Sequence, residues 1–162
     1  MLDRGEATGS LQALILAPAR ERANQVAEEV EMLKGEGGLA IQTVYGGTDL
    51  EKQGKKLGEG VDIIVGTPGR VMDMSERGHI DLTNPTLMCL DEADRMLDMG
   101  FFPDIMWVVE RMKGREQTLL FSATFPQEII DAAHEFMNDP DFVLTNAHTL
   151  DIPPIDLSSV RV

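Results

Sequence analysis

Short apolar segments alternate with amphipathic segments along most of this sequence of 162 residues. Each apolar segment has the length of one β-strand, and the amphipathic segments repeat apolar residues at helical spacing. Alternation of this kind favours βαβ units, in which parallel strands form a sheet and helices cover both of its faces. We therefore expect one α/β domain with a mainly parallel sheet.

Several of the expected strands are near-continuously apolar, as is typical of strands covered on both faces. The expected strands span residues 13–17, 40–45, 61–65, 86–90 and 118–121, with a short sixth strand over 142–144. Helical spacing predicts helices over 23–33, 105–112 and 129–137, and a weaker helix over 50–57 that Gly54 interrupts. The tail over 151–162 contains two prolines in a row and is typical of an extended connector.

Composition restricts the functions open to the chain. The formal net charge of −14 argues against a general nucleic-acid binder, because neutralising phosphates needs Lys and Arg, but it leaves room for a local basic groove. The apolar segments are too short to span a bilayer and the first residues do not resemble a signal peptide, so we expect a cytoplasmic protein without membrane contact. The single Cys89 excludes an internal disulfide, and its strand position predicts a buried, inert thiol.

An acidic run follows the expected strand 86–90 directly. Asp91, Glu92 and Asp94 are thereby placed at the carboxyl end of that strand, and ligands of open α/β sheets bind at this edge. A carboxylate there can hold Mg²⁺ against nucleotide phosphates, and a second one can orient or deprotonate a water molecule. Acids at a helix N-terminus also serve as caps, so the run by itself leaves both interpretations open.

The other strands also end in turns with distinctive residues. A glycine pair lets a backbone or a phosphate approach closely. We expect a helix to begin at residues 67–70, where free N–H groups lie beside Arg70. Hydroxyl groups next to the acidic run can form hydrogen bonds with it. Each turn alone is also typical of an ordinary chain reversal, so only the combination is informative. The turns contain Pro18-Ala19-Arg20-Glu21, Gly46-Gly47, Thr67-Pro68-Gly69-Arg70 and Ser122-Ala123-Thr124.

In this combination the sequence resembles the first RecA-like domain of DEAD-box RNA helicases, which belong to helicase superfamily 2. Residues 91–101 resemble motif II with its flank, and residues 122–124 resemble motif III. Residues 18–21, 46–47 and 67–70 are similar to motif Ia, the glycine doublet and motif Ib. The resemblance extends from about Leu11 to the C-terminus, and it implies a RecA-like three-layer sandwich of the P-loop NTPase type.

The resemblance also implies a role for each acidic and hydroxyl residue. Asp91 would bind Mg²⁺, mostly through water, and Glu92 would activate the attacking water. Asp94 would pair with a second RecA-like domain or with Ser122 and Thr124, whose hydroxyls would couple hydrolysis to strand separation. The cofactors of such an enzyme are ATP and Mg²⁺.

Single-stranded or duplex RNA is the implied partner, held by its sugar-phosphate backbone without reading of the bases. Two positions depart from the usual motif of the family, since Ala19 stands in place of Thr and Arg22 in place of Leu. The first departure removes a hydroxyl that would contact phosphate, and we expect the charge of Arg22 to compensate in part. The residues implied in RNA binding are Pro18, Arg20, Gly46, Gly47, Thr67, Pro68, Gly69 and Arg70.

The phosphate-binding pattern G-x-x-x-x-G-K-[ST] does not occur in the 162 residues. The only Gly-Lys pair, Gly54-Lys55, is followed by Lys56 and lacks the earlier glycine. The glutamine motif that reads adenine in this family is not found either. We therefore expect an N-terminally truncated RecA-like domain over 1–150 and a connector over 151–162 toward a second RecA-like domain.

The expected truncation would remove one strand from inside the sheet, next to the strand that precedes Ser122. An exposed strand edge invites pairing with another chain, so we expect a dimer, strand exchange or marginal stability. Three functions stay open at this point. The chain is a segment of an ATP-dependent RNA helicase, a non-catalytic module that binds RNA or protein, or an inert fragment.

We predict that the 162-residue chain by itself has no significant ATPase or unwinding activity and binds neither ATP nor Mg²⁺ tightly. Positioning of the phosphates supplies most of the catalysis in phosphoryl transfer, and the backbone cradle that positions them is missing from the sequence. The measurement is phosphate release from ATP with and without RNA. Robust RNA-stimulated turnover that the Glu92→Gln substitution abolishes would contradict this prediction.

Overall fold

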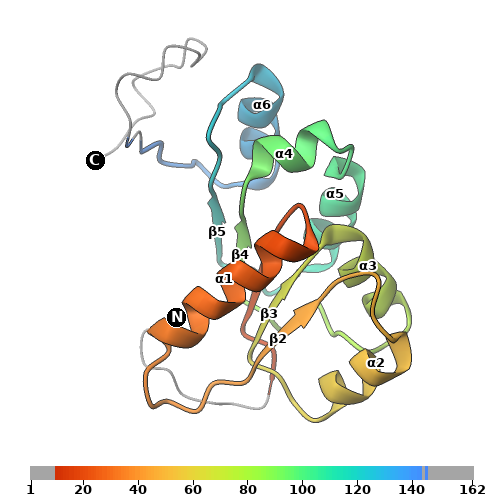
Figure 1. Cartoon of the computed structure of the whole chain (residues 1–162). Coiled ribbons are helices and arrows are strands. Elements are labelled where there is room, and N and C mark those ends of the chain that lie inside the picture. The colour runs from red at the N-terminus through yellow and green to blue at the C-terminus, as the bar shows by residue number, and fades with distance from the viewer. Residues whose placement is uncertain (1–9, 144, 146–162) are drawn as a thin grey trace.

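The computed structural model describes residues 10–143 and 145. Its five strands form one sheet in which every pair of neighbours is parallel. The order across the sheet is β2-β3-β1-β4-β5 (Figure 1). Ala13 pairs with Ile63 on one side and with Leu87 on the other, so β1 is the central strand. The strands are β1 (Ala13–Leu16), β2 (Ile41–Val44), β3 (Ile63–Gly66), β4 (Leu87–Leu90) and β5 (Gln117–Leu120).

Helices connect the strands and cover both faces of the sheet. On one face, Ala23 and Val26 of α1 pack on apolar residues such as Ile63. The other helices lie on the opposite face and build the larger core with Leu14 and Met88 (Figure 1). The three-layer α/β sandwich predicted from the sequence is therefore confirmed. The helices are α1 (Arg20–Leu33), α2 (Leu50–Gly58), α3 (Pro68–Glu76), α4 (Ala93–Asp98), α5 (Phe102–Arg111) and α6 (Gln127–Phe136).

The first five predicted strands are confirmed, with ends displaced by no more than two residues. The sixth, over 142–144, is wrong where the structure describes it, because Phe142 and Val143 pair with no strand and residue 144 lies outside the described residues. The backbone groups of a strand need a neighbouring strand as partner. Here a cleft lies between this segment and the open edge of β5, so no pairing forms.

Two helices also differ from the prediction. α2 runs through Gly54 without interruption, and the glycine has a packing reason, since a Cβ atom there would lie 2.6 Å from His79 Cε1. α4 has no counterpart among the predicted helices, because its six residues are too few to reveal a helical repeat.

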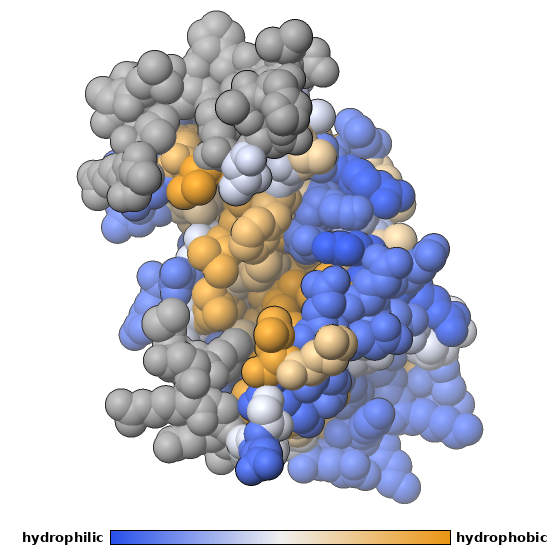
Figure 2. All heavy atoms as spheres, turned by 60° about the vertical axis from the view of Figure 1, so that its left-hand side comes forward, coloured by the Kyte–Doolittle hydropathy of each residue, from blue (hydrophilic) through white to orange (hydrophobic). Residues whose placement is uncertain are grey.

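Among the residues that the structure describes, nothing covers one half of the α1 face. α1 packs against β2 and β3, whereas the same face of β4 and β5 is open, and Leu119 and Phe121 are 36% and 55% exposed. Figure 2 shows apolar residues gathered in a band on this side of the molecule.

Cys89 lies on this face and is half-buried, whereas the sequence predicted a buried thiol. Partial burial, with a smaller effect of Asp91, raises the pKa of the Cys89 thiol to about 12 and keeps the thiol protonated.

A cleft of about 950 Å³ lies beyond the free edge of β5. β5 residues such as Thr118 form one wall, and residues of the segment after α6, among them Pro140 and Val143, form another. Within the described part of the chain, β5, which precedes Ser122, is the last strand on its side of the sheet.

The predicted connector over 151–162 lies outside the described residues. Within residues 10–143 and 145, no helix combines the length and the apolar character that crossing a bilayer requires.

Candidate active site and RNA interface

All the distinctive turns lie at the carboxyl edge of the sheet, because every strand runs in the same direction. Backbone hydrogen bonds continue past the ends of β1, β3, β4 and β5 and tie the turns there to a neighbouring strand. Asp91 N–H donates to the Leu16 carbonyl at 2.9 Å, and Thr67 N–H donates to the Val44 carbonyl at 3.0 Å. The turn after β4 is therefore fixed against β1, and the turn after β3 is fixed against β2.

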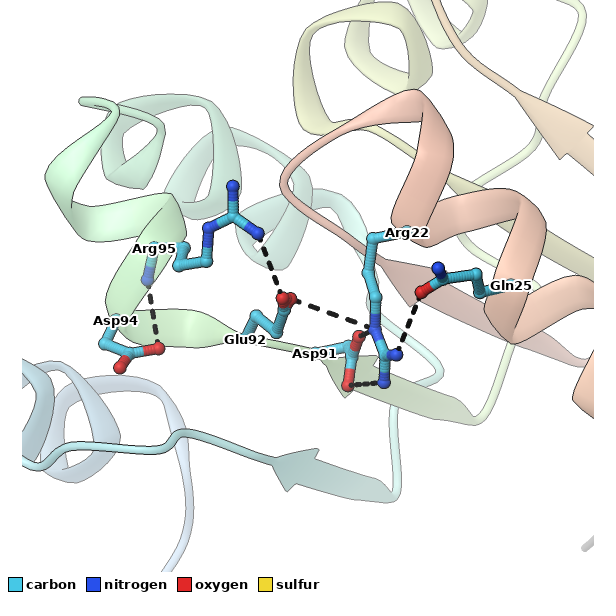
Figure 3. A network of polar contacts seen from close by, with 6 residues as sticks. All are labelled: Arg22, Gln25, Asp91, Glu92, Asp94 and Arg95. Atoms are coloured by element: carbon cyan, nitrogen blue, oxygen red, sulfur yellow. Dashed lines mark hydrogen bonds and ion pairs between the residues drawn. The ribbon is translucent and has the colours of Figure 1, made fainter.

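The carboxylate of Asp91 is held by Arg22 of α1 (Figure 3). Arg22 Nε donates to Asp91 Oδ2 at 2.6 Å, and Arg22 Nη2 donates to Asp91 Oδ1 at 3.4 Å. The side chain of Asp91 is only 14% exposed, so water screens this ion pair less than a surface pair. The hydrogen bond to Asp91 is also the main cause that raises the pKa of Arg22.

Glu92 has a left-handed backbone, with φ of 53° and ψ of 53°. This conformation costs a residue with a side chain roughly 1–2 kcal/mol, and it persists where the surrounding structure fixes it. Glu92 Oε1 accepts from Arg95 Nη1 at 3.2 Å, whereas the buried Oε2 has no hydrogen-bond partner and lies 3.9 Å from Arg22 Nε. Oε2 thus has an unused acceptor capacity although it is buried, and Glu92 lines the cleft beside β5.

Asp94 connects the acidic turn to the turn after β5. Its Oδ2 accepts from the hydroxyl of Thr124 at 2.9 Å and from Thr124 N–H at 3.2 Å. Its own N–H donates to Ser122 Oγ at 3.1 Å, and that hydroxyl donates to the Thr124 carbonyl at 2.6 Å. Burial pushes the pKa of Asp94 upward, but the hydrogen bonds from Thr124, from Arg95 N–H and from Ser122 together lower the pKa below its usual value.

Arg20 and Arg70 lie next to the glycine pair on the other half of the edge. A Cβ atom at Gly46 would lie 4.0 Å from Arg70 Nη2, and one at Gly47 would lie 3.9 Å from Arg20 Nη1. Gly47 has a φ of +83°, which favours glycine, and both glycines are exposed. Two turns that are far apart in the sequence therefore place a guanidinium beside the same open backbone.

Neighbouring residues orient both arginines. Arg70 Nη1 donates to Gln53 Oε1 at 3.3 Å and to the Thr48 carbonyl at 3.5 Å. The Arg20 guanidinium lies over the ring of Tyr45, 5.1 Å from its centroid. These contacts leave further N–H groups of each guanidinium for an anionic ligand, because a guanidinium has five N–H donors.

Two helices begin at this part of the edge without a side-chain cap. Ala19 is the N-cap of α1 and has no side-chain oxygen, and the hydroxyl of Thr67 makes no capping hydrogen bond at the start of α3. The first N–H groups of both helices are therefore available to anions. Pro18 and Pro68 are buried, so they shape these turns rather than offer a surface, whereas Gly69 is exposed.

A comparison with protein-family models decides which family has these features. The model described as DEAD/DEAH box helicase matches residues 1–133. The chain belongs to this family. RNA helicase CrhR of Synechocystis sp. is 46% identical over 143 residues, which are 88% of this chain and 29% of that protein. DEAD-box ATP-dependent RNA helicase CshA of Geobacillus kaustophilus is 42% identical over 146 residues, 90% of this chain and 31% of that protein. The chain thus spans about a third or less of these relatives.

Solved structures agree with the family. The crystal structure of a DEAD box protein from the hyperthermophile Methanococcus jannaschii matches with a TM-score of 0.77 and 45% identity, over 80% of this chain and 36% of that chain. The predicted RecA-like fold of a DEAD-box protein is thereby confirmed.

DEAD-box helicases use ATP and Mg²⁺, and carboxylate oxygens are the ligands that Mg²⁺ prefers. Both oxygens of Asp91, however, accept from Arg22. The part of the chain that the structure describes contains no group of three or more His, Cys, Asp or Glu side chains that could hold a metal. As they are placed, these residues do not fit a magnesium ion.

The sequence did not reveal the role of several residues at the carboxyl edge of the sheet. It assigned Arg22 to the RNA side, but the structure places its guanidinium on Asp91. It did not identify the supporting contacts of Tyr45, Gln53 or Arg95. The departure of Arg22 from the usual leucine was the only signal available, and it did not reveal the partner.

We predict that Thr124→Val raises the pKa of Asp94, because the substitution removes the hydroxyl that donates to Oδ2. A lowered pKa in the folded state stabilises the protein above the unfolded value of about 3.9, and this contribution is lost as pH falls through the folded pKa. The variant should therefore lose this contribution of Asp94 to stability at a higher pH than the wild type does. The measurement is an NMR titration of the Asp94 carboxyl carbon.

Thr83→Val provides the matched control, since the Thr83 hydroxyl donates to Asp81 and lowers the pKa of that residue. It should raise the pKa of Asp81 and leave that of Asp94 unchanged. An Asp94 titration that is identical in the wild type and in Thr124→Val would show that the hydroxyl does not stabilise the carboxylate.

Proposed function

We propose that this chain is part of an ATP-dependent RNA helicase and supplies its RNA-backbone surface together with the acidic residues of its hydrolytic site. One observation supports the proposal above all others. Arg20 and Arg70 lie beside Gly46 and Gly47 on the same edge of the sheet as Asp91. The CrhR and CshA relatives are themselves named as RNA helicases.

The RNA-side turns suit a phosphate backbone rather than bases. Guanidinium groups form paired hydrogen bonds with phosphate oxygens, and uncapped helix starts add backbone N–H donors. The exposed Gly46 and Gly47 have no side chain to keep a sugar-phosphate chain away. Nothing in this set distinguishes one base from another, so the proposed binding is independent of sequence and accepts single-stranded RNA or one strand of a duplex.

The acidic side suits hydrolysis in a complete helicase. We assign the activation of water to Glu92, whose Oε2 lacks a hydrogen-bond partner. Asp91 would hold a metal ion only if Arg22 left its carboxylate. Asp94, bonded to Ser122 and Thr124, links this acidic turn to the turn after β5. Through these hydrogen bonds, a change at the nucleotide can be transmitted from the acidic turn to the turn after β5. A second RecA-like domain is the proposed partner of this edge.

We predict that the chain binds single-stranded RNA at low salt and that Arg70→Ala weakens binding about fivefold. Loss of one charged contact to phosphate costs on the order of 1 kcal/mol, which corresponds to that factor. Arg20→Ala should have a similar effect. The measurement is fluorescence anisotropy with labelled RNAs of unrelated sequence, at several salt concentrations, and affinity should fall as salt rises.

Arg77→Ala serves as the control, because Arg77 carries the same charge at the other end of α3, where it pairs with Asp73. It should change RNA affinity far less than Arg70→Ala. Equal losses in both variants would indicate a diffuse charge effect and contradict the proposed surface. If the wild type binds no RNA even at low salt, the chain is an inert fragment with respect to RNA.

The open edge of β5 supports a second candidate function, the binding of a protein strand. We predict self-association or strand exchange through this edge, because unpaired backbone groups and the exposed Leu119 lie together there. Light scattering over a concentration series should show association that Leu119→Lys weakens. Met32→Lys, at a residue 83% exposed at the end of α1, should not weaken it. A monodisperse monomer with one sharp unfolding transition at all concentrations would exclude this function.

A further inference from the structure

Arg22 of α1 forms ion pairs with two carboxylates of the acidic turn, Asp91 and Glu92. Its guanidinium contacts both oxygens of Asp91, at 2.6 Å from Nε and 3.4 Å from Nη2, and its Nη1 bonds Gln25 Oε1 at 3.3 Å (Figure 3). The same Nε lies 3.9 Å from Glu92 Oε2. A single cation therefore stands between the two carboxylates.

The chain brings these groups together from two distant segments. Arg22 lies in the first turn of α1, and Asp91 directly follows β4, which pairs with β1. The Asp91 N–H bond to the Leu16 carbonyl fixes the acidic turn at the end of β1, close to the start of α1. The sheet thus fixes the backbone positions from which the two side chains meet.

We propose that Arg22 is an internal counter-ion of Asp91 that excludes a divalent cation from this carboxylate until the guanidinium is displaced. A divalent cation and the guanidinium need the same lone pairs of Asp91. Mg²⁺ also requires near-octahedral oxygen ligands at about 2.0–2.1 Å, and a guanidinium hydrogen-bonded to both oxygens leaves no room for that shell.

The charge on Arg22 is permanent, because a guanidinium does not lose its proton in proteins. The exclusion is therefore competitive, and pH between neutral and mildly acidic values does not relieve it. Whether a divalent cation displaces Arg22 from Asp91 therefore depends on the concentration of the cation and on other groups that attract the guanidinium. A leucine at this position, as in the usual motif, would leave the carboxylate free.

The test uses the whole 162-residue chain and Mn²⁺ as a paramagnetic probe of divalent-cation binding. Mn²⁺ broadens the amide NMR signals of residues near it, so a titration reports where the cation binds and how strongly. We expect Arg22→Leu to broaden the signals of Asp91 and Glu92 at about tenfold lower Mn²⁺ than the wild type, which corresponds to 1.4 kcal/mol. Arg22→Lys should be intermediate, because an ammonium keeps the charge but lacks the planar fork.

Two variants separate this effect from general electrostatics. Arg77→Leu removes the same charge from an exposed ion pair with Asp73 and should leave the Asp91 titration unchanged. Asp91→Asn added to Arg22→Leu should abolish the gain. Equal Mn²⁺ affinity at Asp91 in the wild type and in Arg22→Leu would overturn the proposal.

A second measurement on the wild type avoids any dependence on the folding of a variant. Saturating Mg²⁺ should shift the Nε–H signal of Arg22 away from its ion-paired position, together with the amide of Asp91. If Mg²⁺ binds at Asp91 while the Arg22 signal stays in place, both cations share the carboxylate and the proposal is wrong. Neither readout uses RNA or ATP, so the RNA-binding proposal and this one can fail separately.

Discussion

Parallel pairing of the central strand β1 with β3 and with β4 determines where the distinctive turns of this chain lie. Because all strands point the same way, the acidic turn after β4 and the basic helix starts after β1 and β3 reach one edge. Hydrogen bonds such as Asp91 N–H to Leu16 then fix the spacing between turns. The chemistry of the edge follows from this arrangement, since no single turn contains enough groups for a site.

Charge is distributed unevenly along that edge. The protein carries a net charge of −14, yet the part of the edge beside Gly46 and Gly47 presents the guanidiniums of Arg20 and Arg70. On the acidic side, cations of the chain already contact the carboxylates, with Arg22 on Asp91 and Arg95 on Glu92. The guanidiniums of Arg20 and Arg70 thus keep N–H donors for an anion, whereas both oxygens of Asp91 already accept from Arg22.

The sequence predicted the elements with strong local patterns and missed those that depend on distant partners. Apolar runs located the five strands, and Pro68 with the preceding threonine located the start of α3. The sequence could not show that Phe142 and Val143 form no strand, since strand pairing depends on a neighbour across the cleft. The Arg22–Asp91 contact joins residues 69 positions apart, and the left-handed backbone of Glu92 belongs to a non-glycine residue. Neither leaves a local sequence signal.

The most direct test of this account is an NMR titration of the isotopically labelled chain with single-stranded RNA. The account predicts that one saturable transition shifts the amides of Arg20, Gly46, Gly47, Gly69 and Arg70 together, with the strand interiors unchanged. Such a result would show that turns from three strands form one surface. Shifts that occur at separate RNA concentrations for each turn, or that lie at the opposite edge of the sheet, would contradict it.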